Sequence, residues 1–234
     1  MESRTLLVSG TSRGLGQALA EHYLALGHSV IGCSRSEASI SHPAYQHYAI
    51  DVSNEEQVTG LVRALRREGP GKLDAVINNA GIAAMNAFAL SPISSFDRIF
   101  DVNVRGTALF CQKTLPLLRK ATHPRIVNFT TIAVPMRLNG EAFYAASKSA
   151  VETLTRIIAR EYGSYGITCN AVGPSPIDTA LIAGVPADKI DRLLSQQAIK
   201  EKATADDVIN AVDFFLRPES RHITGQILYL GGYG

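Results

Sequence analysis

Tyr144 and Lys148 lie four residues apart in the segment Tyr144-Ala-Ala-Ser-Lys148. On a helix this spacing places the phenol and the ammonium on the same face. A free tyrosine titrates near about 10, and a neighbouring positive charge favours the phenolate. With its pKa lowered in this way, Tyr144 could protonate a carbonyl oxygen or deprotonate an alcohol. So short a pattern also occurs by accident on protein surfaces, so its meaning depends on the rest of the chain.

A glycine-rich segment near the amino terminus, Ser9-Gly10-Thr-Ser-Arg-Gly14-Leu-Gly16, follows a short apolar run. Glycines between a strand and a helix permit positive φ and close approach of the backbone to a pyrophosphate, which then lies at the helix amino terminus. The spacing is Gly-x-x-x-Gly-x-Gly, and a glycine trio alone also fits a plain turn. Its place after the first predicted strand of an alternating pattern favours dinucleotide binding.

The second predicted strand ends in Gly32-Cys33-Ser34-Arg35, with no acid before Glu37. A dehydrogenase that binds NAD usually has a carboxylate here for the ribose diol, whereas a 2′-phosphate requires a cation. Arg35, the Ser34 hydroxyl and Arg13 of the glycine segment are the candidates to bind that phosphate. Each arginine alone also fits a solvated surface charge. Together they favour NADP(H) over NAD.

Short apolar runs that alternate with segments of helical period must position these groups. The pattern predicts an α/β chain: a single-domain Rossmann fold over residues 1–234, with a doubly wound, seven-stranded parallel sheet and helices on both faces. Residues 173–200 are predicted to form a substrate flap. The predicted strands are Thr5–Ser9, Ser29–Ser34, His47–Ile50, Ala75–Asn78, Arg125–Phe129, Thr168–Val172 and Gln226–Leu230, and the predicted helices are Leu15–Leu26, Glu55–Arg67, Phe96–Arg119, Phe143–Tyr162 and Asp206–Leu216.

The composition narrows the class of protein. The chain has 23 basic and 21 acidic residues and no long block of one sign, so neither nucleic acid nor an anionic membrane is an expected partner. Three widely spaced cysteines suit small core residues in a reducing compartment, and the apolar run Thr5–Ser9 is too short for a signal sequence or membrane span. We therefore expect a cytoplasmic enzyme. The six histidines have no metal-ligand spacing, and no metal site is expected.

Further motifs occur in a fixed order: Asp51-Val52, Asn78-Asn79-Ala80-Gly81, Asn103 and Ile223-Thr-Gly-Gln226. With the glycine segment and the Tyr144/Lys148 pair, they make essentially the entire chain resemble the classical short-chain dehydrogenase/reductase family, with a general likeness to β-ketoacyl carrier-protein reductases and related ketoreductases. The resemblance implies that Asn103, Thr131, Tyr144 and Lys148 are catalytic. It also implies a cofactor site made of Gly10, Ser12, Arg13, Gly14, Leu15, Gly16, Ser34, Arg35, Asp51, Val52, Asn79, Ala80, Gly81, Tyr144, Lys148, Pro174, Ile177 and Thr179.

The resemblance also implies individual roles. Asp51 would hold the adenine amino group, and Asn78 would lie near the adenine ribose. Lys148 would hydrogen-bond the nicotinamide ribose, and Asn103 would help to hold a water chain from Lys148 to solvent. Ile177 would contact the nicotinamide carboxamide through its backbone, and Thr179 a phosphate through its hydroxyl.

The chain departs from the family pattern at several positions. Thr131 stands 13 residues before Tyr144, where the family normally has a serine; its hydroxyl can do the same work, but its methyl group takes space beside the carbonyl. Val134 replaces a frequent glycine and should narrow the pocket further. Ser175 replaces the glycine of a Pro-Gly pair, which puts a side chain where backbone is expected to approach the nicotinamide. Leu230-Gly231-Gly232 lacks an acid often found before the terminal glycines.

We expect an NADPH-dependent ketoreductase in which Thr131 and Tyr144 bind the carbonyl oxygen. One alternative is a secondary-alcohol or sugar-alcohol dehydrogenase in the oxidising direction, and another is a non-catalytic NADP(H)-binding regulatory subunit. The expected substrate is a small carbonyl or alcohol compound, either free or linked to a carrier protein or CoA, whose anionic groups Arg137 and Arg192 could face. The long helices predicted over Phe96–Arg119 and Phe143–Tyr162 are of the kind family members pair in homodimers or homotetramers.

Overall fold

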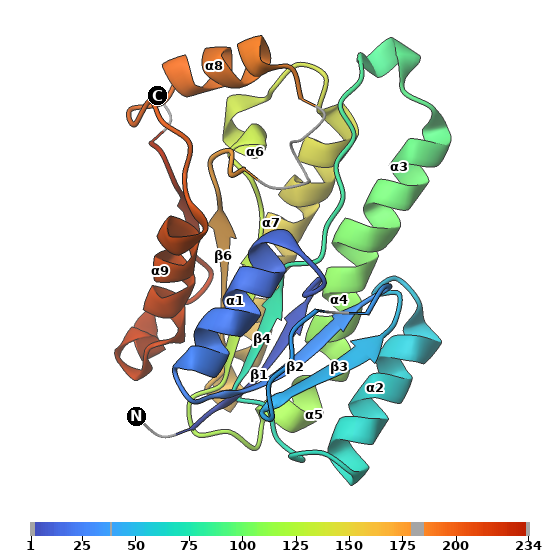
Figure 1. Ribbon diagram of the computed structural model, residues 1–234, viewed down its shortest axis with the longest axis vertical. Helices are drawn as coiled ribbons and strands as arrows, with labels where there is room; N and C mark the ends of the chain where they lie inside the picture. The colour runs from blue at the N-terminus through green and yellow to red at the C-terminus, as the bar shows by residue number, and fades with distance from the viewer. Residues whose placement is uncertain (1–2, 38, 179–184, 233–234) are drawn as a thin grey trace.

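Seven strands form one parallel sheet in the order β3-β2-β1-β4-β5-β6-β7 (Figure 1). The structure is a computed structural model that describes residues 3–37, 39–178 and 185–232. This sheet, with helices on both faces, confirms the predicted doubly wound Rossmann fold. The strands are β1 (Thr5–Ser9), β2 (Ser29–Ser34), β3 (Tyr45–Ala49), β4 (Ala75–Asn78), β5 (Arg125–Phe129), β6 (Thr168–Gly173) and β7 (Ile227–Tyr229).

Four central strands have the predicted bounds, β6 ends one residue later than predicted, at Gly173, and the two edge strands differ more. β1, β4 and β5 are buried along their whole length and β2 at every residue but Ser29, so their apolar runs mark them clearly in the sequence. β3 begins at Tyr45 rather than at His47, because its ladder with β2 pairs Val30 with Tyr45 and Ser34 with Ala49. β7 is shorter than predicted and spans only Ile227–Tyr229. An edge strand is half exposed, and its pairing partner decides where it starts.

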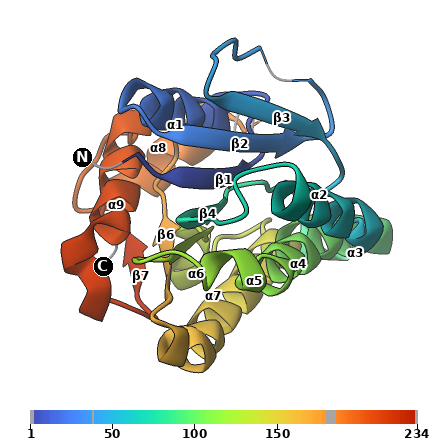
Figure 2. The ribbon, with the colours of Figure 1, turned by 90° about the horizontal axis from the view of Figure 1, so that it is seen from below.

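Helices cover the sheet on both sides (Figure 2). α1 (Gly14–Ala25) and α9 (Ala205–Leu216) pack on one face, where Leu6 and Val8 of β1 point. Leu7 points to the opposite face, which is covered by α2 (Glu55–Arg67), α4 (Gly106–Lys113), α5 (Leu115–Leu118) and α7 (Ala142–Tyr162). This alternation along β1 divides the apolar core into two layers.

The prediction of one helix over Phe96–Arg119 is wrong: the helical region begins earlier, at Ile93, and is divided into several segments. The structure has α3 (Ile93–Phe100), a π-helical segment (Asp101–Arg105), α4 and, after Thr114, α5. α3 and α4 still form one long rod (Figure 1). A π-helical segment inserts an extra residue into the turn and redirects side chains, and such segments recur at functional sites. This one carries Asn103.

Two short helices lie beyond the carboxyl ends of the strands, at the top of Figure 1: α6 (Ala133–Met136) and α8 (Ala187–Ser195). α8 was not predicted and lies within the expected flap region 173–200. Part of that region, together with Thr179, lies outside the described residues. Short 3₁₀ helices span Phe88–Leu90, Gly163–Tyr165 and Pro218–His222. No described helix is long and apolar enough to cross a membrane.

Candidate active site

The Thr131 hydroxyl lies beyond the carboxyl end of β5, close enough to Tyr144 to lower the pKa of its phenol. Tyr144 lies in the first turn of α7 and is 8% exposed, while Thr131 is half-buried and is the second residue after β5. The Ala133 N–H donates to Thr131 Oγ1 at 3.2 Å, which orients the threonine at the start of α6. The structure therefore brings the two predicted hydroxyl groups together.

The protonation of Tyr144 differs from the sequence-based expectation. Burial, followed by the negative charge of Glu141, raises the pKa of Tyr144 above its usual value, and the hydrogen bond with Thr131 only partly opposes this rise. The expected lowering by Lys148 is therefore not found in the ligand-free chain, because desolvation disfavours the phenolate more strongly. At neutral pH Tyr144 is a neutral phenol that can donate a proton.

Lys148 lies one helical turn after Tyr144 and is 4% exposed. Its Nζ donates to the main-chain oxygen of Phe129 at 2.9 Å, and burial lowers its pKa to about 8. Gly81 leaves room beside it, since a Cβ built on Gly81 would lie 3.3 Å from both Lys148 Nζ and Asn103 Oδ1. Lys148, Asn103 and Gly81 in the turn after β4 therefore lie next to one another.

Asn103 is fully buried on the π-helical segment. Its Oδ1 accepts from the Ile82 N–H, and its Nδ2 donates to the Ile82 carbonyl oxygen, both at 2.9 Å. Nδ2 also donates to Ser147 Oγ at 3.0 Å on α7. The side chain therefore joins the turn after β4 to the helix that carries Tyr144 and Lys148, while the Asn103 carbonyl oxygen accepts from Thr107 Oγ1 at 2.8 Å.

The glycine segment has the geometry of a phosphate cradle. Gly10 and Gly14 have φ of 78° and 59°, and a Cβ on Gly16 would lie 2.1 Å from the Gly10 carbonyl oxygen. Asn79 holds this turn, since its Nδ2 donates to the Ser9 carbonyl oxygen at 2.9 Å. Among the described residues, Arg13 at the N-cap makes no side-chain capping bond, and the first turn of α1 contains no acidic residue. The N–H groups of this first turn therefore remain available to bind an anion. The residues present thus fit the pyrophosphate of a dinucleotide.

The predicted adenosine end lies beside this cradle. The Cys33 carbonyl oxygen accepts from the Gly10 N–H at 2.7 Å, which brings the ends of β1 and β2 together. Arg13 and Arg35, which follow these strands, are both exposed. Burial tends to raise the pKa of Asp51, but two hydrogen bonds from Ser53 to Asp51 Oδ1 and the nearby charge of Arg35 lower it overall.

The Ser34 hydroxyl is engaged within the chain. It is buried and donates to the Ser36 carbonyl oxygen at 2.6 Å, which closes the turn after β2, and its contact with a 2′-phosphate stays a prediction. His47 Nε2 lies 3.3 Å from the same hydroxyl. Sequence reasoning missed the polar chain behind this turn: Tyr45 OH shares hydrogen bonds with His47 Nδ1 at 3.0 Å and with Thr11 Oγ1 at 2.9 Å. Only the pairing of β3 with β2 brings these side chains together.

Comparison with known proteins agrees with this geometry. The sequence model of the family described as enoyl-(acyl carrier protein) reductase matches residues 10–233. The chain belongs to the short-chain dehydrogenase/reductase family. It is 31% identical to 2-(R)-hydroxypropyl-CoM dehydrogenase of Xanthobacter autotrophicus, over 98% of both chains. It is 29% identical to 3-oxoacyl-(acyl-carrier-protein) reductase FabG of Escherichia coli, over 99% of this chain and 97% of FabG.

Two solved structures are similar over nearly the whole chain, each with a TM-score of 0.88. One is ligand-free aldohexose dehydrogenase of Thermoplasma acidophilum, 29% identical, over 99% of this chain and 94% of that chain. The other is ElxO with NADP bound, 25% identical, over 98% of this chain and 97% of that chain. As a member of this family of dehydrogenases and reductases, the chain is an oxidoreductase.

Two short-chain dehydrogenase/reductase positions differ from their expected roles. The Asn78 side chain is buried, and its Nδ2 donates to Asn128 Oδ1 at 2.8 Å, so it points into the core rather than toward an adenine ribose. Ser175 is also buried, and its hydroxyl donates to Gln197 Oε1 at 2.9 Å. The serine in place of the usual glycine therefore turns toward the segment after α8.

The remaining predicted cofactor residues lie around the same edge. Pro174 approaches the start of α6, where its carbonyl oxygen accepts from the Ile132 N–H at 3.4 Å. Ile177 forms an isolated parallel bridge with Ala203. The Ala80 N–H donates to Ser9 Oγ at 3.0 Å and supports the cradle. Ser12 and Leu15 are partly exposed in the glycine segment, and Val52 is buried in the core.

A cavity of about 620 Å³ lies beside α7. Its lining includes Val134, Arg137 and Ala145, but neither Thr131 nor Tyr144. Val134 thus forms part of the wall of this cavity, and its predicted narrowing of a pocket beside the carbonyl stays a prediction. Phe88, from the segment after β4, contributes an exposed ring to the lining. No cluster of His, Cys, Asp or Glu within the described residues is placed to hold a metal ion.

Proposed function

We propose that this oxidoreductase uses NADPH to reduce a ketone to a secondary alcohol, with Tyr144 as the proton donor. The observation that carries the proposal is the pairing of the Thr131 hydroxyl with the buried phenol of Tyr144, one helical turn from the buried Lys148. Two neighbouring hydroxyl groups suit a carbonyl oxygen, which can accept a hydrogen bond from each of them.

When bound, NADPH supplies the hydride. Thr131 and Tyr144 hydrogen-bond the carbonyl oxygen of the substrate and stabilise the negative charge that develops on it. Because the pKa of Tyr144 is raised, its phenol is protonated at neutral pH and gives its proton to that oxygen. The Lys148 ammonium then stabilises the phenolate that is left, and burial of Tyr144 and Lys148 limits the access of water to them.

The preference for NADPH over NADH is proposed from the two arginines at the adenosine end. Arg35 follows β2, where an NAD-binding chain usually has a carboxylate, and Arg13 lies in the glycine segment. An arginine fork suits a 2′-phosphate. ElxO, which is similar over nearly the whole chain, binds NADP.

The substrate class is proposed from the relatives and the cavity. The names of two relatives specify a hydroxypropyl group on CoM and a 3-oxoacyl group on an acyl carrier protein, both attached to a larger handle. The cavity beside α7, with Arg137 in its lining, offers room and positive charge for such a handle. Sugar oxidation is the second candidate, because the similar Thermoplasma acidophilum structure is an aldohexose dehydrogenase.

The test is NADPH oxidation, with NADH alongside, against acyl-thioester, cyclic and aromatic ketones, and NADP⁺ reduction against secondary alcohols and aldohexoses. Wild-type protein should reduce a ketone with NADPH, and Tyr144→Phe should lose about 10²–10⁴-fold in kcat. The NADPH dissociation constant of the variant, from fluorescence titration, should stay near the wild-type value. Tight NADPH binding with no turnover in either direction would favour the regulatory subunit instead.

A homo-oligomer is part of the proposal. Phe88, Leu90 and Ile93 lie close together in the chain before and at the start of α3 and are each at least 70% exposed. Large apolar side chains exposed together mark contact surfaces. Light scattering of the purified protein should give a dimer or tetramer, and a monomer at micromolar concentration would contradict this.

A further inference from the structure

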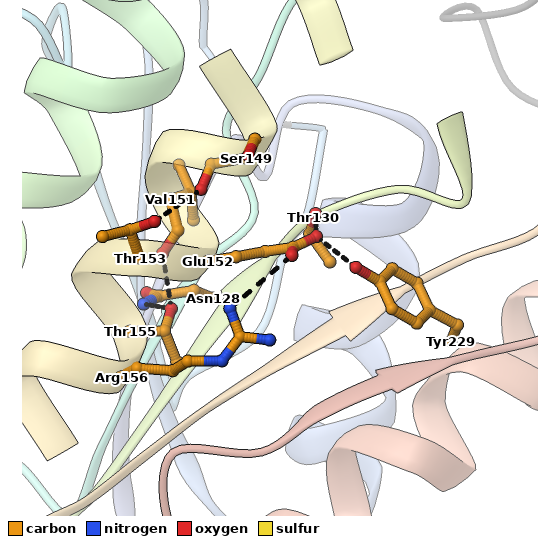
Figure 3. A network of polar contacts seen from close by, with 9 residues as sticks. All are labelled: Asn128, Thr130, Ser149, Val151, Glu152, Thr153, Thr155, Arg156 and Tyr229. Carbon is orange, nitrogen blue, oxygen red and sulfur yellow. Dashed lines mark hydrogen bonds and ion pairs between the residues drawn. The ribbon is translucent and has the colours of Figure 1, made fainter. Parts of the chain in front are cut away.

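Glu152 is a buried carboxylate on α7, one helical turn beyond Lys148, and it is 5% exposed. Its Oε1 accepts hydrogen bonds from Thr130 Oγ1 at 2.6 Å and from Tyr229 OH at 2.5 Å (Figure 3). Its Oε2 lies 3.9 Å from the guanidinium of Arg156 on the exposed side of the helix. Burying a charge is costly unless it is paired and hydrogen-bonded, so both hydroxyl groups contribute to keeping this carboxylate in place.

The bond to Thr130 reaches the end of β5. Thr130 stands between Phe129, whose carbonyl oxygen accepts from Lys148, and Thr131, whose hydroxyl meets Tyr144. The Thr130 N–H donates to the Val172 carbonyl oxygen at 2.8 Å. Glu152 therefore holds the side chain of the residue whose peptide plane carries the oxygen bound by Lys148.

The bond to Tyr229 reaches the end of β6. Tyr229 of β7 pairs in register with Gly173, and a Cβ built on Gly173 would lie 2.4 Å from Tyr229 Cδ1. The tyrosine ring thus occupies the space that a side chain would fill and extends to Glu152, as Figure 3 shows. Pro174, the next residue, accepts from the Ile132 N–H. One carboxylate therefore holds α7 and, through two side chains, the ends of β5 and β6.

We propose that Glu152 is a positioning residue of the active site: through Thr130 and Tyr229 it holds the ends of β5 and β6 so that Lys148 and Thr131 stand correctly beside Tyr144. The inference rests on the proposed function for the reaction that it supports. Glu152 itself touches none of the reacting groups. It acts by fixing the Phe129 carbonyl oxygen and the Thr131 hydroxyl, on which proton donation by Tyr144 depends.

The variants separate the hydrogen bonds from the charge. Glu152→Gln keeps an oxygen that can accept from both hydroxyl groups, whereas Glu152→Leu removes the acceptor at similar volume. Thr130→Val and Tyr229→Phe each remove one donor. Thr155→Val is the matched control, because Thr155 is equally buried on α7 and accepts from Asn128 Nδ2 at 2.9 Å, but lies one turn farther from Lys148.

The first readout needs no substrate. In the complex with NADP⁺, the near-ultraviolet difference between each protein and its Tyr144→Phe counterpart reports the titration of the Tyr144 phenol. A displaced Lys148 stabilises the phenolate less, so Glu152→Leu should raise the titration midpoint by about one pH unit. Glu152→Gln and Thr155→Val should keep the wild-type midpoint.

The second readout is kinetic and uses whichever ketone the wild type reduces. We expect Glu152→Leu to lower kcat by about 10–100-fold, with KM changed less than about threefold, since positioning acts on the transition state. Glu152→Gln should restore kcat to within about threefold of wild type, because its amide oxygen can make both bonds. Thermal unfolding confirms that each variant is folded at the assay temperature.

A midpoint and a kcat in Glu152→Leu equal to those of Thr155→Val would overturn the inference and leave Glu152 as a residue that only stabilises the fold. Should Glu152→Leu not fold, Thr130→Val, which has almost the same shape as the wild-type residue, decides the matter by the same titration. If the wild-type protein reduces none of the tested ketones, the proposed reaction is refuted. The Tyr144 titration in the complex with NADP⁺ needs no substrate and still decides the role of Glu152.

Discussion

The Lys148 ammonium donates to the main-chain oxygen of Phe129 at 2.9 Å, in a position where water hardly reaches either group. This bond joins the helix that carries Tyr144 to the end of the strand that leads to Thr131. The same burial lowers the pKa of Lys148 to about 8. Keeping the buried ammonium charged at neutral pH therefore reduces the free energy of unfolding.

Lys148→Met should therefore stabilise the chain at neutral pH while abolishing activity. The folded-state pKa of about 8 lies below the ordinary value of 10.5, so between these pH values the unfolded chain binds more protons and stability rises with pH. Below about pH 8 we expect the variant to exceed wild type by about 1–3 kcal/mol in free energy of unfolding, with the gap closing toward pH 10. Urea denaturation at several pH values measures it. A variant less stable than wild type at pH 7 would contradict the prediction.

The pH dependence of turnover should follow the raised pKa of Tyr144. Reduction uses the neutral phenol, so kcat for ketone reduction should be level through neutral pH and fall only on the alkaline side. Oxidation of the product alcohol uses the phenolate and should increase with pH. Initial rates in both directions at saturating substrate test this. A reductive kcat that increases with pH would show that Tyr144 is not the proton donor.

Replacing Arg35 should change the choice of cofactor. Arg35→Ala removes the proposed cation for the 2′-phosphate, and a bond to a charged group is worth about 1.5–3 kcal/mol, so the NADPH dissociation constant should increase about 10–100-fold. The NADH constant should change less than about threefold, because NADH has no 2′-phosphate. Fluorescence titration gives both values. Arg66→Ala, an exposed arginine of α2, is the control. Equal weakening of both cofactors would argue against a phosphate contact.

Ser175 should matter for stability rather than for cofactor affinity. Its buried hydroxyl donates to Gln197, so Ser175→Ala should cost about 1 kcal/mol of unfolding free energy, the usual value of one buried hydrogen bond. The NADPH dissociation constant should stay within about twofold of wild type. Ser175→Gly, the family's usual residue, should likewise not tighten NADPH. A fivefold gain in affinity would mean that the serine hinders the cofactor.

Much of the fold was predictable because local patterns carry it. The buried central strands β1, β2, β4 and β5, in which only Ser29 is partly exposed, have their predicted bounds, since an apolar run between turn residues marks them without reference to any neighbour. Helix α2 also has its predicted bounds, because Asn54 caps it and acidic and basic residues occupy its first and last turns. Where pairing or packing sets an end, as for β3 and β7, the prediction was less accurate.

The spacing of Tyr144 and Lys148, the glycine segment and the family motifs are properties of the sequence by itself, and they determined the family and the candidate site residues. Only the tertiary structure decided how those residues behave. Burial reversed the expected direction of the Tyr144 pKa shift, because desolvation depends on what surrounds the ring. The bonds of Glu152 to Thr130 and Tyr229 join residues 22 and 77 positions apart. No local pattern contains such contacts, because strand order and helix packing create them.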